Sequence, residues 1–247
     1  MKLLLMADGK VGLEIAGWLM REYPEDLSLV VTVAENEIFD AAHNEGFRAR
    51  VFASGTQLCE FLTERRIQLD LGLLAWWPLI LKAPLISATA HGFVNTHPSL
   101  LPHNRGKHYN FWTIVEQAPF GVSLHFVDGG IDSGDVIAQT PIPYGWEDTG
   151  GTLYAKATRE MVQLFKKTYP SLRRLDLKRI PQDPSAGSFH TAKELETASR
   201  IDLEKSYRAR DLLNLLRART FPGYPGCTFA DDHVEYEVAI EIKRKTV

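Results

Sequence analysis

The chain has 247 residues, 45% hydrophobic and 24% charged, which is an ordinary globular composition and enough length for one large domain with a small appendage. Its 28 basic and 31 acidic residues give a net charge of −3, so no basic excess points to a nucleic-acid partner. The two cysteines make no disulfide framework, and no apolar stretch has the length of a signal-peptide core or a membrane span. We therefore expect a cytoplasmic protein with no membrane partner.

Strands and helices alternate along the first part of the chain. Short apolar runs predict strands at residues 2–7, 27–34, 50–52, 71–75 and 92–95. Helical spacing of apolar residues predicts helices over residues 11–23, 37–45 and 56–66, with Gly46 suited to a C-terminal cap and Thr56 to an N-cap. This alternation, with short connections, predicts an α/β fold in which a mostly parallel sheet carries helices on both faces.

The second part of the chain changes composition near residue 180. We predict helices over residues 109–116, 152–172 and 209–219, strands over 121–127 and 136–143, and a terminal hairpin formed by 227–230 and 236–243. Residues 180–187 have the composition of a linker, and Thr191 and Glu194 have the spacing of a capping box. We therefore predict a main domain over residues 1–180 and a C-terminal appendage, a small helix and a β-hairpin, over residues 181–247.

Polar side chains gather where the predicted strands end. Asn95 and His97 lie two residues apart on a strand, so their side chains point to the same face. In a parallel sheet the ligand site lies beyond the carboxyl ends of the strands, where we also expect Asp8, Trp76 and Trp77. With Asp132 from a later turn-rich segment, the amide and the imidazole could serve acyl-group chemistry. Spacing alone slightly favours a purely structural role for these residues.

Other kinds of site are less well supported. Several histidines crowd one region (His91, His97, His103 and His108), but no pair has a recognised zinc spacing and no cysteine lies near, so we predict no metal. The pair Gly9 and Gly12 lacks the rest of a phosphate-binding motif, although it could let an anion approach a helix N-terminus. Trp77 is as consistent with core packing as with the wall of a ligand site, and His125 is better explained as a structural histidine.

Three ordered segments of the chain resemble the 10-formyltetrahydrofolate-dependent formyltransferases. The first is Asn95-x-His97-Pro98-Ser99-Leu100-Leu101-Pro102-x-x-Arg105-Gly106. The second is GVSLHFVDGGIDSGD at residues 121–135, and the third is DTGGTLYAK at residues 148–156. The three segments occur in the same order and at the same separation as in that family. A purely structural role for Asn95, His97 and Asp132 is therefore no longer the better explanation.

The resemblance implies a Rossmann-like formyltransferase fold and a formyl donor. It implies that Asn95, His97 and Asp132 are the catalytic residues, and that residues 1–180 form the catalytic domain. The donor and co-substrate would be 10-formyltetrahydrofolate, with no metal. By their offset from the motifs, the residues expected to contact the folate are Leu79, Ile80, Leu81, Asp128 and Ile131.

The acceptor is suggested by the tail of the chain. The tail is too short for the C-terminal barrel of the transfer-RNA branch of this family, and Lys107 to Tyr109 depart from that branch's usual residues. Residues 201–203, 217–221 and 223–225 resemble the sugar N-formyltransferase branch. This resemblance implies an amino-dideoxy sugar linked to a nucleotide, with dTDP favoured, used for a surface polysaccharide such as the O-antigen of lipopolysaccharide. A methionyl-tRNA formyltransferase and a non-catalytic folate- or nucleotide-binding protein remain as alternatives.

A sugar nucleotide predicts further contacts. Its diphosphate could meet Gly9 and Lys10 at a helix N-terminus, and its base could stack on Tyr224, which lies in a Gly/Pro loop. We add Trp77 and Arg105 as predicted substrate contacts. In the terminal hairpin, apolar residues alternate and leave a face to cover, which in this branch is typical of a homodimer; they are Val234, Tyr236, Val238, Ile240 and Ile242.

Overall fold

The computed structural model describes residues 1–245 and divides the chain into two compact units. Unit 1 consists of Met1–His97, Ser123–Gln139 and Thr158–Gln182, and unit 2 consists of Pro98–Val122, Thr140–Ala157 and the stretch from Asp183 onward. The boundary predicted at residue 180 lies close to Gln182, where the last segment of unit 1 ends. The roles assigned to the two sides of that boundary stay predictions.

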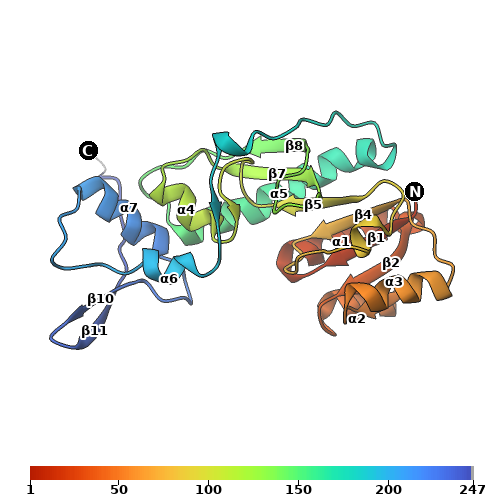
Figure 1. Ribbon diagram of the computed structural model, residues 1–247, viewed down its shortest axis with the longest axis horizontal. Helices are drawn as coiled ribbons and strands as arrows, with labels where there is room; N and C mark the ends of the chain where they lie inside the picture. Colours follow the sequence, from red (N-terminus) through yellow and green to blue (C-terminus); the bar gives the residue numbers. More distant parts are fainter. Residues whose placement is uncertain (246–247) are drawn as a thin grey trace. The chain divides into compact units, whose positions relative to one another are not determined.

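A seven-stranded sheet has the strand order β3-β2-β1-β4-β5-β7-β8 (Figure 1). The strands are β1 Leu3–Ala7, β2 Leu27–Thr32, β3 Ala49–Val51, β4 Leu71–Ala75, β5 Phe93–His97, β7 Gly121–Phe126 and β8 Val136–Pro141. The pairs among β1 to β5 are all parallel, whereas β5 and β7 pair antiparallel. The mostly parallel sheet predicted from the sequence is therefore confirmed.

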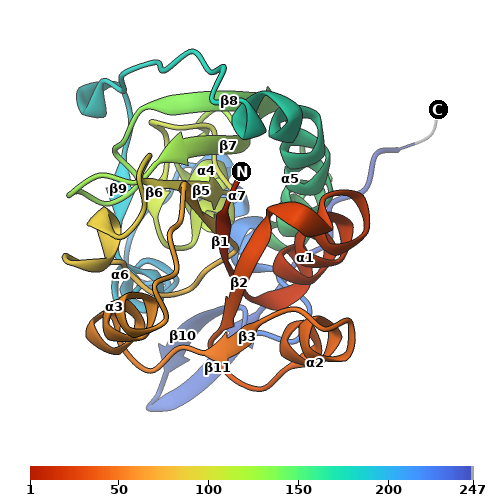
Figure 2. The same cartoon turned by 90° about the vertical axis from the view of Figure 1, so that its right-hand side faces the viewer.

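The predicted helices are also present. They are α1 Gly9–Glu22, α2 Glu37–Asn44, α3 Gly55–Glu64, α4 Tyr109–Val115, α5 Gly150–Arg173 and α7 Ala209–Arg219. Figure 2 shows α1 and α2 on one side of the sheet and α3 on the other, so the expectation of helices on both faces is confirmed. The N-cap of α3 was predicted wrongly: it is Ser54, whose Oγ accepts the Gln57 N–H at 3.2 Å, and Thr56 lies inside the helix.

Several short elements were not predicted from the sequence. They are β6 Arg105–Gly106, β9 Phe189–His190, α6 Glu194–Ala198 and the 3₁₀ turns Pro24–Asp26, Leu85–Ser87 and Pro184–Ala186. The capping-box spacing before α6 has a physical counterpart, since the Glu194 carboxylate accepts the Thr191 N–H at 2.8 Å.

Burial in the core of unit 1 explains why the sequences of its strands are continuous apolar runs. All five residues of β1 and of β4 are buried, as expected for strands covered on both faces. Leu58 and Leu62 of α3 pack with residues from β1, β2, β4 and β5 in one buried cluster. On the helix-α1 side, Trp18 lies edge-on to Phe165 of α5 with ring centroids 5.9 Å apart. Among the described residues, no helix is both long and apolar enough to cross a membrane.

Unit 2 contains a two-stranded hairpin of β10 Cys227–Asp231 and β11 Val234–Val238. The turn residues Asp232 and His233 have φ of 45° and 66°, the left-handed conformation that a two-residue hairpin loop requires. The second strand was predicted two residues too late and too long. Ile240 and Ile242 lie beyond β11, because the apolar alternation in the sequence continues after the pairing stops.

Candidate active site

The carboxyl ends of β1, β4 and β5 lie at one edge of the sheet. Ala7 pairs with Ala75 and Leu74 pairs with Asn95, so the residues that follow these strands lie next to one another at this edge. Thr96 holds the edge together, since its Oγ1 accepts the Trp76 N–H at 2.9 Å and donates to the Leu74 carbonyl at 3.1 Å. Asp8, Trp76 and Asn95 follow these strand ends as predicted, whereas Trp77, predicted with them, packs into the core of unit 1.

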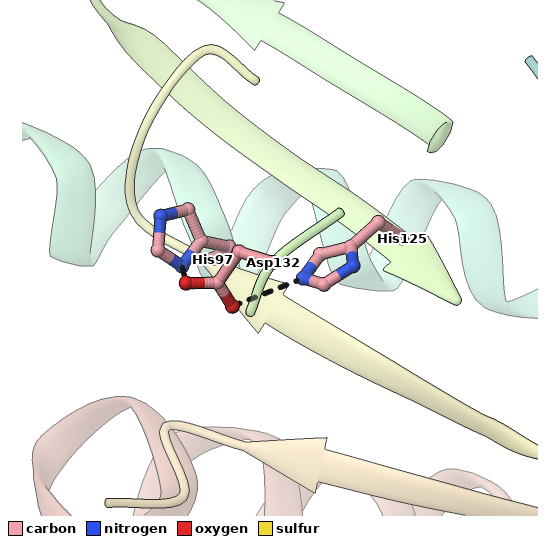
Figure 3. Close-up of side chains that lie close together, drawn as sticks. All are labelled: His97, His125 and Asp132. Atoms are coloured by element: carbon pink, nitrogen blue, oxygen red, sulfur yellow. Dashed lines mark ion pairs between the residues drawn. The ribbon is translucent and has the colours of Figure 1, made fainter. Parts of the chain in front are cut away.

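Three predicted residues, Asn95, His97 and Asp132, meet at this edge; Figure 3 shows His97 and Asp132 together with His125. Asn95 and His97 project from the same face of β5, and Asp132 comes from the loop between β7 and β8. Oδ2 of Asp132 lies 3.4 Å from Nδ1 of His97, and Oδ1 accepts from the Asn95 amide at 3.4 Å. The side chain of His97 is only 6% exposed and that of Asp132 15%. The fold therefore brings together an amide donor, an imidazole and a carboxylate from two segments.

His125, interpreted from the sequence as a structural histidine, also belongs to this cluster. It lies on β7 directly opposite Asn95 in the antiparallel ladder. Its Nδ1 is 2.8 Å from the Phe126 carbonyl oxygen, a contact that requires an N–H. In the neutral imidazole Nε2 therefore carries the lone pair, and it accepts from the Asn95 amide at 3.2 Å. The β5–β7 register would have revealed it, but the alternation of residues 121–127 alone does not give that register.

The side chains of this cluster can also be considered as ligands of a metal ion. Ligand atoms of His97, His125 and Asp132 lie within 4.8 Å of one another, the spacing of a group that could hold an ion. However, the Asn95 amide donates its N–H groups to His125 and Asp132, and those hydrogens point at the lone pairs that a cation would need. The donor set therefore suits proton transfer and hydrogen bonding better than metal binding.

The loop that carries Asp132 also carries two residues predicted to contact folate. Oδ1 of Asp128 accepts from the Gly130 N–H at 3.0 Å and from the Ser133 hydroxyl at 2.8 Å, so its side chain shapes the loop from within. Ile131 is 42% exposed at the tip. After β4, Leu79 and Ile80 are also exposed, at 46% and 68%, and offer apolar surface to a flat ring.

Two predicted contacts after β4 are buried. Leu81 and Trp77 belong to the core cluster of unit 1, and the Trp77 ring lies edge-on to Phe52 with centroids 5.4 Å apart. For Trp77 this position favours core packing over a substrate contact. Gly9 and Lys10 form the exposed first turn of α1, directly after the N-cap Asp8. The backbone N–H groups of that turn have no partner within the helix and suit an anion.

Arg105 and Tyr224 belong to unit 2. Arg105 lies on β6, which pairs with β9, and its Nη2 donates to the Pro184 carbonyl at 3.5 Å. Tyr224 is 66% exposed in the loop after α7, with its ring edge-on to Phe221 at 5.1 Å. Tyr224 lines a pocket of about 330 Å³ whose other walls include His108, Tyr109, Tyr154, Arg219 and Phe221. Burial, followed by the charge of Arg219, lowers the pKa of His108 in this pocket.

Comparisons with known proteins agree with this geometry. A family model described as "Formyl transferase" matches residues 31–168, and one described as "N-formyltransferase dimerization C-terminal domain" matches residues 194–244. A methionyl-tRNA formyltransferase from Alkaliphilus oremlandii is 29% identical over 67% of this chain and 52% of its own length. One from Listeria monocytogenes is 32% identical over 50% of this chain and 40% of its own length. The chain thus spans about half the length, or less, of these curated relatives.

Solved structures show the same fold over the whole chain. A 4-N formyltransferase from Francisella tularensis has a TM-score of 0.82 at 24% identity, covering 99% of this chain and 98% of that one. A sugar N-formyltransferase from Shewanella has a TM-score of 0.81 at 18% identity, covering 100% and 99%. An N-formyltransferase from Helicobacter canadensis, in complex with folinic acid and dTDP-3-aminofucose, has a TM-score of 0.72 at 18% identity, covering 94% and 85%.

Proposed function

This chain belongs to the formyl transferase family, and we propose that it transfers a formyl group from 10-formyltetrahydrofolate to the amine of a nucleotide-linked amino sugar. The observation that carries the proposal is the cluster of Asn95, His97 and Asp132, with an amide, an imidazole and a carboxylate within hydrogen-bonding reach at the edge of the sheet. These are the groups that an attack of an amine on a formyl carbon requires.

Asn95, His97 and Asp132 have different roles in this reaction. The acceptor nitrogen forms a bond to the formyl carbon, and the formyl oxygen becomes an oxyanion. The His97 imidazole, whose Nδ1 lies 3.4 Å from the Asp132 carboxylate, stabilises that oxyanion together with the Asn95 amide. The carboxylate of Asp132 takes the proton that the amine loses. The oxyanion then re-forms the formyl carbonyl as the bond from the carbon to N10 of the folate breaks. N10 takes up the proton that Asp132 received, so that tetrahydrofolate leaves and the carboxylate is restored.

Asn95 must change one hydrogen bond during this reaction. Its amide nitrogen now donates to Nε2 of His125 at 3.2 Å and to Oδ1 of Asp132 at 3.4 Å. The longer contact is the weaker one, so the N–H directed at Asp132 is the one that turns to the oxyanion. His125 keeps the other N–H and thereby holds the amide in place.

The choice of a sugar over transfer RNA rests on the extent of the comparisons. The sugar and 4-N formyltransferase structures match this chain from end to end, and the C-terminal family model covers its tail. The methionyl-tRNA formyltransferases leave about half or more of their length unmatched. The net charge of −3 also gives no attraction for a polyanion. We propose a dTDP-linked amino-dideoxy sugar, whose formylated product enters a bacterial surface polysaccharide such as O-antigen.

Each unit, taken by itself, has features that suit one part of the two substrates. The pocket beside Tyr224 has aromatic walls and a volume of about 330 Å³, which suits a nucleotide base. The first turn of α1, with Gly9 and Lys10, suits the diphosphate. The exposed apolar residues Leu79, Ile80 and Ile131 suit the folate.

Incubation with 10-formyltetrahydrofolate and a panel of dTDP- and UDP-linked 3-amino and 4-amino sugars tests the function. Mass spectrometry should find one sugar that gains a formyl group, and His97→Ala should lower the rate by orders of magnitude because it removes a group that acts only in the transition state. Product from none of the sugars, or formylation of methionyl-tRNA instead, would contradict the proposal.

Replacement of Tyr224 tests the base pocket. Tyr224→Ala should raise KM for the sugar nucleotide about 10-fold with kcat little changed, since stacking of a base on an aromatic ring contributes about 1–3 kcal/mol. Tyr207→Ala, which truncates another tyrosine of unit 2 outside the pocket, is the matched control. Equal KM values for the two variants would remove Tyr224 from the site.

We infer that two copies of the chain pair through the hairpin. Val234 and Tyr236 of β11 are 50% and 45% exposed, and the Tyr236 ring stacks on Phe229 with centroids 5.2 Å apart. The C-terminal family model is one of a dimerization domain. An apolar strand exposed in this way is normally covered by a partner.

Sedimentation equilibrium measures this association. The chain should sediment as a dimer and Tyr236→Glu as a monomer, because the substitution places a charge in the apolar contact. His233→Glu, in the turn between the same two strands, should remain dimeric. A wild-type monomer, or a dimer that Tyr236→Glu leaves intact, would contradict the inference.

A further inference from the structure

The side chain of Gln182 forms two hydrogen bonds with the loop that carries Asp132. Its Nε2 donates to the carbonyl oxygen of Asp132 at 2.9 Å and to that of Gly134 at 2.6 Å. One amide group therefore uses both of its N–H donors on two carbonyls of the same short turn. Gln182 lies in the segment whose composition predicted a linker, and neither the predicted site nor the proposed function gives it a role.

Gln182 is itself held in place by the residues before it. Ile180 exchanges two backbone hydrogen bonds with Val136 at the start of β8, with lengths of 2.8 and 2.9 Å. The guanidinium of Arg179 lies over the Phe126 ring, 3.6 Å from its centroid. The segment is thus docked on β7 and β8, the two strands that the Asp132 loop connects, and its end reaches the loop in a defined register.

The loop needs support from a residue outside it, because its backbone conformation is strained at Asp132. Asp132 has φ of 51°, a left-handed conformation that costs energy for any residue with a Cβ atom. Asp128 ties down the first part of the turn through Gly130 and Ser133. The second part approaches the backbone of β7 so closely at Gly134 that no side chain fits there. Gln182 fixes the carbonyl groups of Asp132 and Gly134, which lie on either side of Ser133 in the sequence.

We propose that Gln182 is a positioning residue for formyl transfer, which fixes the Asp132 backbone so that its carboxylate faces His97 and Asn95. The proposal rests on the proposed function. Gln182 does not touch the reacting atoms; it acts through Asp132. Loss of its two donors leaves the backbone at Asp132 free to relax, and the carboxylate then moves away from Nδ1 of His97.

Gln182→Met tests this role, because it keeps the length of the side chain and removes both donors. It should lower kcat about 10- to 100-fold, the usual effect of misplacing a reacting group by a fraction of an ångström to an ångström. KM for the folate and for the sugar nucleotide should change little. Gln163→Met, the same substitution at an exposed site on α5, is the matched control and should behave as wild type.

A double-mutant cycle separates positioning from a general loss of structure. Asp132→Asn lowers kcat by itself; if Gln182 acts through that carboxylate, adding Gln182→Met should cause no further loss. Losses that multiply, or a Gln182→Met enzyme with wild-type kcat, would overturn the proposal. If Gln182→Met does not fold, Gln182→Asn serves instead, since it keeps the amide but is too short to reach both carbonyls. Absence of turnover in the wild-type chain would refute the proposed function rather than this role.

Discussion

The candidate site depends on a change of strand direction at β5. Its neighbour on one side, β4, runs parallel to it, and its neighbour on the other, β7, runs antiparallel. The parallel side places the end of β5 at the carboxyl edge of the sheet, where ligand sites form in α/β folds. The antiparallel side sets His125 opposite Asn95, and the loop that follows β7 brings Asp132 to Asn95 and His97.

The polar groups gathered there are mostly buried, and they satisfy one another. Burial of an unpaired amide or imidazole costs about 1–3 kcal/mol, so these side chains stay in place only because each finds a partner. Asn95 bridges His125 and Asp132, and the Phe126 carbonyl fixes the tautomer of His125. The loop is tied from within by Asp128 and from outside by Gln182. A site held in this way is organised before the substrate binds.

Much of this arrangement follows from the sequence, and the remainder required tertiary information. The buried strands were predictable because their apolar runs are unbroken, and Asn95, His97 and Asp132 because they occur in family motifs. His125 required the register between two strands, which the residues of either strand alone do not determine. Gln182 lies in a segment without periodicity, so only the folded chain shows what it contacts. The hairpin was misplaced because apolar alternation continues past the last paired residue.

In the proposed reaction the Asn95 amide stabilises the oxyanion of formyl transfer. Single-turnover transfer of the ¹³C-labelled formyl group from bound 10-formyltetrahydrofolate to the acceptor sugar, measured in Asn95→Ala, tests this role. The rate should fall about 100- to 1,000-fold, equivalent to roughly 3–4 kcal/mol for the loss of one such donor, with folate affinity little changed. A rate within a few-fold of wild type at saturating substrates would show that the oxyanion is stabilised elsewhere and would contradict the account.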